Sequence, residues 1–416
     1  MRGGTGSIVV AVGLVLVSLN CVARFAGMPG VVAYLLVGLP ALALLFRYGI
    51  PFLVERRPGR SIDLALAVGT LACLLIAFVV LYPLANSGRI GPGSDRDEAL
   101  NTADAELLAG RYPYYPRTYL GAPVTPMPGA LLLALPFHLL GNAAYQNVFW
   151  MVAFLGLLAA GVGSLRLALL TLLFSLAGSP ELLKEFAIGG DFGTNAIYVL
   201  IFTQLLVWTV ASARSRVMGV VAAVAFGMAC SSRPNFVLLA PLVFASLTNR
   251  VGWRRAAAYL GIALLAAAGM TLPFYFHDPH NFSPLHVTTF VSDLDQKLPN
   301  ARVAVYGLAV LGSLGLAVRQ YARRQPAAFP ADAALPSPCA AGTTEDARLF
   351  LHCALVQAVP VLAAAAIACA IEPIWSTRSA YQMPLPLRHL SAGHAYVYFL
   401  VYAWALGHAR VVRPGP

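Results

Sequence analysis

The sequence predicts an all-α protein, a polytopic membrane bundle of about twelve transmembrane helices with juxtamembrane helices in a large first external loop. Composition, the spacing of apolar runs and the sidedness of charge each indicate this class. Of 416 residues, 59% are hydrophobic and 11% are charged, whereas soluble domains carry about 25% charged residues. This composition excludes an ordinary soluble domain and makes the lipid bilayer the first expected partner.

Nine apolar runs of about 20 residues are each long enough to cross the roughly 30 Å hydrocarbon core. They lie at 7–26, 29–46, 62–82, 144–165, 193–211, 256–275, 301–318, 349–371 and 392–408. A shorter run at 166–178 and two of about 15 residues between Arg216 and Arg250 complete the count. The first run lacks a convincing cleavage site, so we expect a retained helix.

Basic residues set the expected orientation. The segment 47–61 carries four arginines and is therefore placed in the cytoplasm, so the next helix leads to an external loop at 83–143. With both termini inside, the cytoplasmic segments hold 17 basic and 5 acidic residues, and the external segments hold 11 and 12. The net charge of +11 thus follows from topology, and no nucleic-acid partner is predicted. Between 129 and 212 the chain must cross the membrane an odd number of times to bring the next basic residues to the cytoplasm, and three other apolar runs already do so. The segment 129–140 is therefore predicted to be a juxtamembrane helix on the outer surface.

Three regions follow from this organisation. Residues 1–60 form an N-terminal helical hairpin without an assigned role, 61–300 form the core, and 301–416 form C-terminal helices with a cytoplasmic linker at 325–347 that is rich in Ala, Pro, Ser and Thr. No charged residue lies in the middle of a predicted crossing, which counts against an ion-coupled carrier.

The external loop contains the candidate catalytic residues. It holds five of the seventeen acidic residues, on or near a short helix predicted to end at Gly110. A positioned carboxylate can deprotonate an acceptor hydroxyl. Asp97 is favoured because Asn101 and Asp104 continue its helix face, while Asp95 is an alternative base or an N-cap. The alternative is that these acidic residues form a solvent-exposed face of a loop helix and have no catalytic role.

Further candidates are spread over the other external segments. Arg233, in the turn Ser-Ser-Arg-Pro-Asn between the two shortest crossings, is expected at the floor of an outer depression, where it could bind a phosphate or act as an interfacial anchor. Asp191 is a substrate-binding acid or an N-cap. The remaining substrate-binding candidates are Glu98, Tyr114, His277 and Arg378.

No metal site and no cofactor are predicted. Two histidines three residues apart, His277 and His280, are weak evidence for a metal even with Asp278 between them. The six cysteines contain no CxxC pair and read as small apolar helix residues.

The order of several motifs over residues 62–300 resembles the GT-C superfamily of integral-membrane glycosyltransferases, especially its bacterial mannosyltransferase-like branch. The motifs are Ser-Asp-Arg-Asp-Glu-Ala-Leu from Ser94, Leu-Leu-Ala-Gly-Arg-Tyr-Pro-Tyr from Leu107, Pro-Met-Pro-Gly from Pro126, Gly-Gly-Asp at Asp191, Ser-Arg-Pro-Asn at Arg233 and Leu-Pro-Phe-Tyr-Phe-His-Asp-Pro ending at Pro279.

The resemblance implies an enzyme of a bacterial cell membrane with an extracytoplasmic active site. It would transfer a mannose-like hexose or a pentose from a polyprenyl-phosphate donor to a lipid or glycan acceptor by inverting displacement. Asp97 or Asp95 would be the base, and Arg233 would lie near the lipid phosphate. The chain departs from the family in having three helices before the loop instead of one. A lipid-linked-sugar flippase or other transporter, and a non-catalytic membrane assembly protein, are the alternatives.

Overall fold

The computed structural model describes residues 3–56, 59–87, 94–212, 215–288, 294–323, 344–372 and 385–409. These residues form helices joined by turns, and they contain no β-strand beyond one isolated bridge between Arg117 and Pro123. The prediction of an all-α chain is therefore confirmed for the described part.

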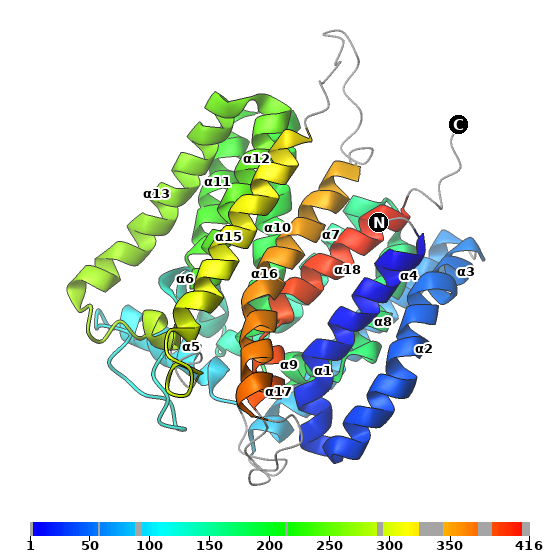
Figure 1. Cartoon of the computed structure of the whole chain (residues 1–416), viewed down its shortest axis with the longest axis horizontal. Coiled ribbons are helices and arrows are strands. Elements are labelled where there is room, and N and C mark those ends of the chain that lie inside the picture. Colours follow the sequence, from blue (N-terminus) through cyan, green and yellow to red (C-terminus); the bar gives the residue numbers. More distant parts are fainter. Residues whose placement is uncertain are drawn as a thin grey trace.

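The chain begins with a helical hairpin. Helix α1 (Gly3–Ala33) contains a break at Gly27, whose φ of 63° is a conformation that favours glycine. The returning arm runs through four short elements, η1 (Tyr34–Gly38), α2 (Leu39–Leu44), η2 (Leu45–Gly49) and α3 (Ile50–Glu55). Figure 1 shows this arm beside α1 and antiparallel to it.

The long helix α4 (Arg60–Asn86) leads to the elements of the predicted external loop, α5 (Arg96–Leu108), α6 (Pro128–Leu139) and η3 (Ala143–Tyr145). Gly110 follows α5 with φ 69°, as expected for a glycine that ends a helix. In Figure 1, α5 and α6 lie at the lower end of the bundle, and the start of α1 and the end of α18 (His394–His408) lie at the upper end.

Further helices and short 3-10 elements make up the rest of the described chain. They are α7 (Gln146–Val162), α8 (Leu165–Gly178), α9 (Pro180–Ala187), α10 (Asp191–Ser212), α11 (Arg216–Cys230), η4 (Pro234–Leu239), α12 (Ala240–Val251), α13 (Trp253–His277), η5 (Ser283–Thr288), α15 (Ala301–Ala322), α16 (Thr344–Ile371) and α17 (Leu385–Leu390). The predicted linker at 325–347 lies outside the described residues except for 344–347, which begin α16.

Seven helical segments of the described chain are long and apolar enough to cross a membrane, which indicates a multi-pass membrane protein. They are Gly4–Glu55, Ser61–Asn86, Ala143–Val162, Asp191–Ser212, Trp253–His277, Ala301–Ala322 and Thr344–Ile371, and the first contains both arms of the hairpin. The bent pair of α8 and α9 is either an eighth, broken span or a re-entrant loop. Helices α11, α12 and α18 have 15, 12 and 15 residues, shorter than the roughly 20 that a bilayer requires. Twelve crossings therefore remain a prediction.

Backbone hydrogen bonds join the Pro-Met-Pro-Gly motif of the predicted external loop to the Ser-Ser-Arg-Pro-Asn turn in the short α11–α12 hairpin. The backbone N–H of Met127 donates to the carbonyl of Ser232 at 3.3 Å, and that of Gly129 donates to Ser231 at 3.0 Å. Gly129 packs so closely that a Cβ there would overlap the carbonyl oxygen of Met228. The Pro-Met-Pro-Gly segment is thereby held beside the turn that carries Arg233.

We expect Gly129→Ala to destabilise the protein by about 1–3 kcal/mol, because the obstacle is backbone that has to shift. Gly156→Ala in α7 is the matched control, since a Cβ at Gly156 meets nothing within 4 Å. Thermal unfolding of the purified protein measures both variants. Equal melting temperatures for the two would contradict this close packing.

Candidate functional site

The ends of α9 and α10 form the base of the candidate site. Helices α8 and α9 meet at an angle of 93° around Ser179, whose side chain caps α9 by accepting from the N–H of Leu182. Gly189 and Gly190 then connect α9 to α10. Gly189 has φ 70°, and a Cβ there would lie 2.7 Å from the ring of Tyr82, while a Cβ at Gly190 would overlap the carboxylate of Glu185.

Asp97 is buried in the first turn of α5, with 6% of its surface exposed. The Tyr82 hydroxyl donates to its Oδ2 and in turn accepts from the side-chain amide of Asn142 at 2.8 Å. Its Oδ1 is buried and has no hydrogen-bond partner among the described residues. Burial raises the pKa of Asp97, against the opposing effect of the Tyr82 hydrogen bond. This carboxylate is thus oriented through one oxygen, while the other is buried without a hydrogen-bond partner in the described chain.

The two neighbouring acids hold the loop that follows. The Thr118 hydroxyl donates to Asp95 Oδ2 at 2.6 Å, and the Tyr119 N–H donates to Glu98 Oε2 at 3.1 Å. Asp95 occupies the N-cap position of α5, although its side chain makes no capping bond. The geometry therefore favours Asp97 over Asp95 as a base, and both roles remain predictions.

One aromatic ring joins the acidic loop to the hairpin turn. The guanidinium of Arg96 lies 3.6 Å from the centroid of Phe192, and that of Arg233 lies 4.8 Å from the same centroid. Arg96 also donates to both carboxylate oxygens of Glu185 at 2.7 Å. Arg233 pairs with Asp191, the first residue of α10, and is 9% exposed. Asp191 and Arg233, predicted separately, are in contact.

A cavity of about 430 Å³ opens at Arg233. Its polar lining includes Asn195, Asn235, Gln357 and His394 beside Arg233. Its apolar walls come from η4, η5, α15 and α16 and include Phe236, Leu285, Val305, Pro360, Val361 and Ala364. The Nε of Arg233 is buried without a hydrogen-bond partner in the described chain. Such a cavity suits a ligand with a polar or anionic head and an apolar tail.

Two of the other predicted site residues, Tyr114 and His277, do not line this cavity. Tyr114 is 3% exposed inside the loop, where its hydroxyl donates to the carbonyl of Pro126 at 3.2 Å. His277 is exposed, with its ring 4.7 Å from that of Tyr112. Arg378 lies outside the described residues. Their roles in substrate binding remain predictions.

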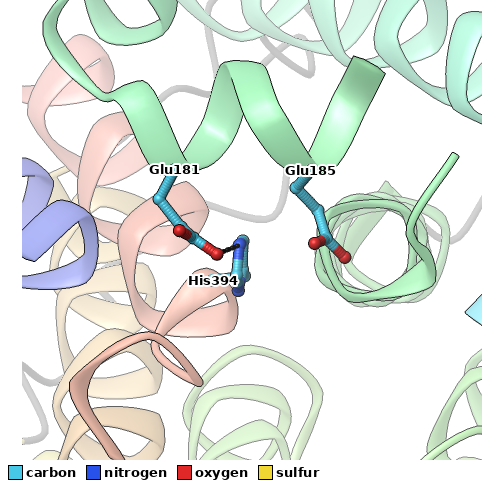
Figure 2. A group of neighbouring side chains, drawn as sticks. All are labelled: Glu181, Glu185 and His394. Carbon is cyan, nitrogen blue, oxygen red and sulfur yellow. Dashed lines mark ion pairs between the residues drawn. The ribbon is translucent and has the colours of Figure 1, made fainter. Parts of the chain in front are cut away.

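The sequence reasoning missed one buried cluster. Glu181 and Glu185 extend from successive turns of α9 toward His394, the first residue of α18 (Figure 2). Their ligand atoms all lie within 4.8 Å of one another. The i, i+4 spacing of the two glutamates was a signal in the sequence, whereas nothing in it linked them to a histidine about 210 positions later.

Asp104 is a second buried acid of α5, two turns beyond Asp97. It is 0% exposed, and neither carboxylate oxygen has a hydrogen-bond partner among the described residues. Its neighbours in α5, Leu100 and Ala103, belong to the apolar cluster of the loop, which also contains Tyr114. Burial raises its pKa to about 8.

We expect Asp104 to make the protein less stable as pH rises. The folded state retains its proton to about pH 8, whereas the unfolded chain loses it near the ordinary value of 3.8. Between these values the folded state binds more protons, so each pH unit lowers the free energy of unfolding by up to about 1.4 kcal/mol. The neutral Asp104→Asn variant should lose this slope, and its melting temperature relative to wild type should increase from pH 5 to pH 8. A constant difference would contradict a protonated Asp104.

Comparisons of the chain with protein-family models, with curated proteins and with solved structures found no match.

Proposed function

We propose that this protein is a membrane glycosyltransferase of the GT-C type. It transfers a sugar, a mannose-like hexose or a pentose, from a polyprenyl-phosphate donor to a lipid or glycan acceptor outside the cytoplasm. The observation that carries the proposal is the cavity at Arg233, which combines a buried guanidinium with apolar walls from α15 and α16 and adjoins the helix of Asp97 through Arg96 and Phe192.

The phosphate and the lipid tail of the donor each have a counterpart in this arrangement. The phosphate would accept from the Nε–H of Arg233, while Asp191 fixes the guanidinium from its other side. The first isoprene units would lie along the apolar cavity wall and continue into the bilayer, because α15 and α16 are candidate membrane spans.

The proposed reaction is a single displacement. Oδ1 of Asp97 takes the proton of the acceptor hydroxyl, whose oxygen forms a bond to the anomeric carbon. The bond from that carbon to the phosphate oxygen breaks, its electron pair leaves on polyprenyl phosphate, and Arg233 stabilises this anion. A membrane topology with twelve crossings, both termini in the cytoplasm and α5 outside a bacterial cell membrane belongs to the same proposal.

The decisive test is sugar transfer by the purified protein in lipid, with a panel of polyprenyl-phosphate sugars and candidate acceptors. Release of polyprenyl phosphate together with a glycosylated acceptor is expected. The cavity would equally suit a lipid-linked-sugar flippase, which would move a labelled donor across a liposome bilayer without consuming it. If neither sugar transfer nor donor movement is observed, an assembly protein is favoured and the proposal is overturned.

A further inference from the structure

The cluster of Glu181, Glu185 and His394 has the donor set of a divalent-cation site. The three side chains are 1–2% exposed, and their ligand atoms lie within 4.8 Å of one another. Ligands on a tetrahedral Zn²⁺ lie roughly 3.3 Å apart, given metal–ligand bonds of about 2.0–2.1 Å. The side chains therefore have to close by only about 1–1.5 Å, which small rotamer adjustments, chiefly of Glu181, provide.

Unpaired polar atoms give this cluster its second, independent observation. Neither ring nitrogen of His394 has a hydrogen-bond partner among the described residues, and the same is true of Oε2 of Glu181. The nearest acid to the imidazole is Glu181, whose Oε1 lies 3.8 Å from Nε2. A fully buried imidazole without a partner is unfavourable, and a metal ion would supply the missing interaction.

Two protein cations already neutralise the glutamates. Lys184 Nζ lies 2.6 Å from Glu181, and Arg96 lies 2.7 Å from Glu185. Lys184 is the replaceable one, because its flexible side chain is 22% exposed and can turn toward solvent. Glu185 is held more firmly, since Arg96 and the Phe192 N–H both donate to it.

We infer that Glu181, Glu185 and His394 bind one divalent transition-metal ion, with Lys184 leaving Glu181 as the ion enters. One imidazole and two carboxylates suit Zn²⁺ or Mn²⁺. Three protein ligands leave coordination positions open, and His394 is also part of the cavity lining. The site lies beside Arg233 and would accept a phosphate oxygen or water. Metal binding itself does not depend on the proposed transfer reaction.

The test is a titration of the full chain, purified without a histidine tag, with Zn²⁺ alone and with Mn²⁺ alone. We expect one ion per chain, and an at least tenfold loss of affinity in Glu181→Gln and in His394→Gln. Lys184→Met should raise the affinity about tenfold, because it removes the competing charge. His280→Gln, a change at an exposed histidine away from the cluster, should leave affinity unchanged.

Co²⁺ substitution adds a readout that a purely structural cluster would not give. The visible absorption bands of a low-coordinate ion should be present in wild type and lost in His394→Gln. The inference is overturned if wild type takes up neither ion at one per chain, or if Glu181→Gln and Lys184→Met bind as wild type does. If a substitution of buried His394 prevents folding, the partly exposed Lys184 still gives the deciding comparison.

Discussion

Asp97→Asn should lower the turnover of sugar transfer by about 10²- to 10⁴-fold, because a positioned general base contributes that much. The amide keeps the shape of the carboxylate and can still accept from the Tyr82 hydroxyl, so the fold of α5 should persist. Asp95→Asn is the matched control two residues before Asp97, since Asp95 is bonded to Thr118 within the loop. The control should retain most of the activity.

The pH profile gives the same prediction a second readout. Because burial raises the pKa of Asp97 above its ordinary 3.8, the fraction of enzyme with an ionised base, and with it kcat/KM, should rise as pH increases through that raised pKa. Asp97→Asn should lack this acidic limb. Wild-type turnover in Asp97→Asn, or an unchanged pH profile, would remove Asp97 from the mechanism.

Local sequence signals were sufficient for much of the fold. Apolar runs of helical length located the long helices, and the returning N-terminal arm and the short α11–α12 hairpin follow the same rule. Gly110 ends α5 where a left-handed glycine was expected. These features depend on residues a few positions apart, and periodicity and capping report such distances.

The candidate site was only partly predictable, because its pairs join distant segments. The contacts of Arg96 with Glu185 and of Arg233 with Asp191 span 89 and 42 positions. No local pattern announces such a pair. The bend between α8 and α9 was missed for a related reason. The apolar run ends at Ser179, but the direction of α9 is set by packing, including the bond between the hydroxyls of Ser18 and Ser179 at 2.7 Å.

Substitution of Arg233 should affect both donor binding and stability. Arg233→Met should abolish donor binding, since it removes the cationic group that would hold the phosphate. It should also destabilise the protein by about 3–5 kcal/mol, because it leaves the carboxylate of Asp191 buried without its ionic partner. The amide of Asn195 still donates to Asp191 at 3.0 Å, which favours the lower end of this range.

The double variant Asp191→Asn/Arg233→Met separates stability from function. Removing both charges takes away the uncompensated buried carboxylate, so the melting temperature should return most of the way to that of wild type. Sugar transfer should stay absent, because Arg233 is the only arginine among the described residues that line the cavity. Arg233→Lys should fall between these cases, since an ammonium keeps the charge but not the planar pair of donors. Transfer regained along with stability would show that Arg233 serves the fold and that another group binds the phosphate.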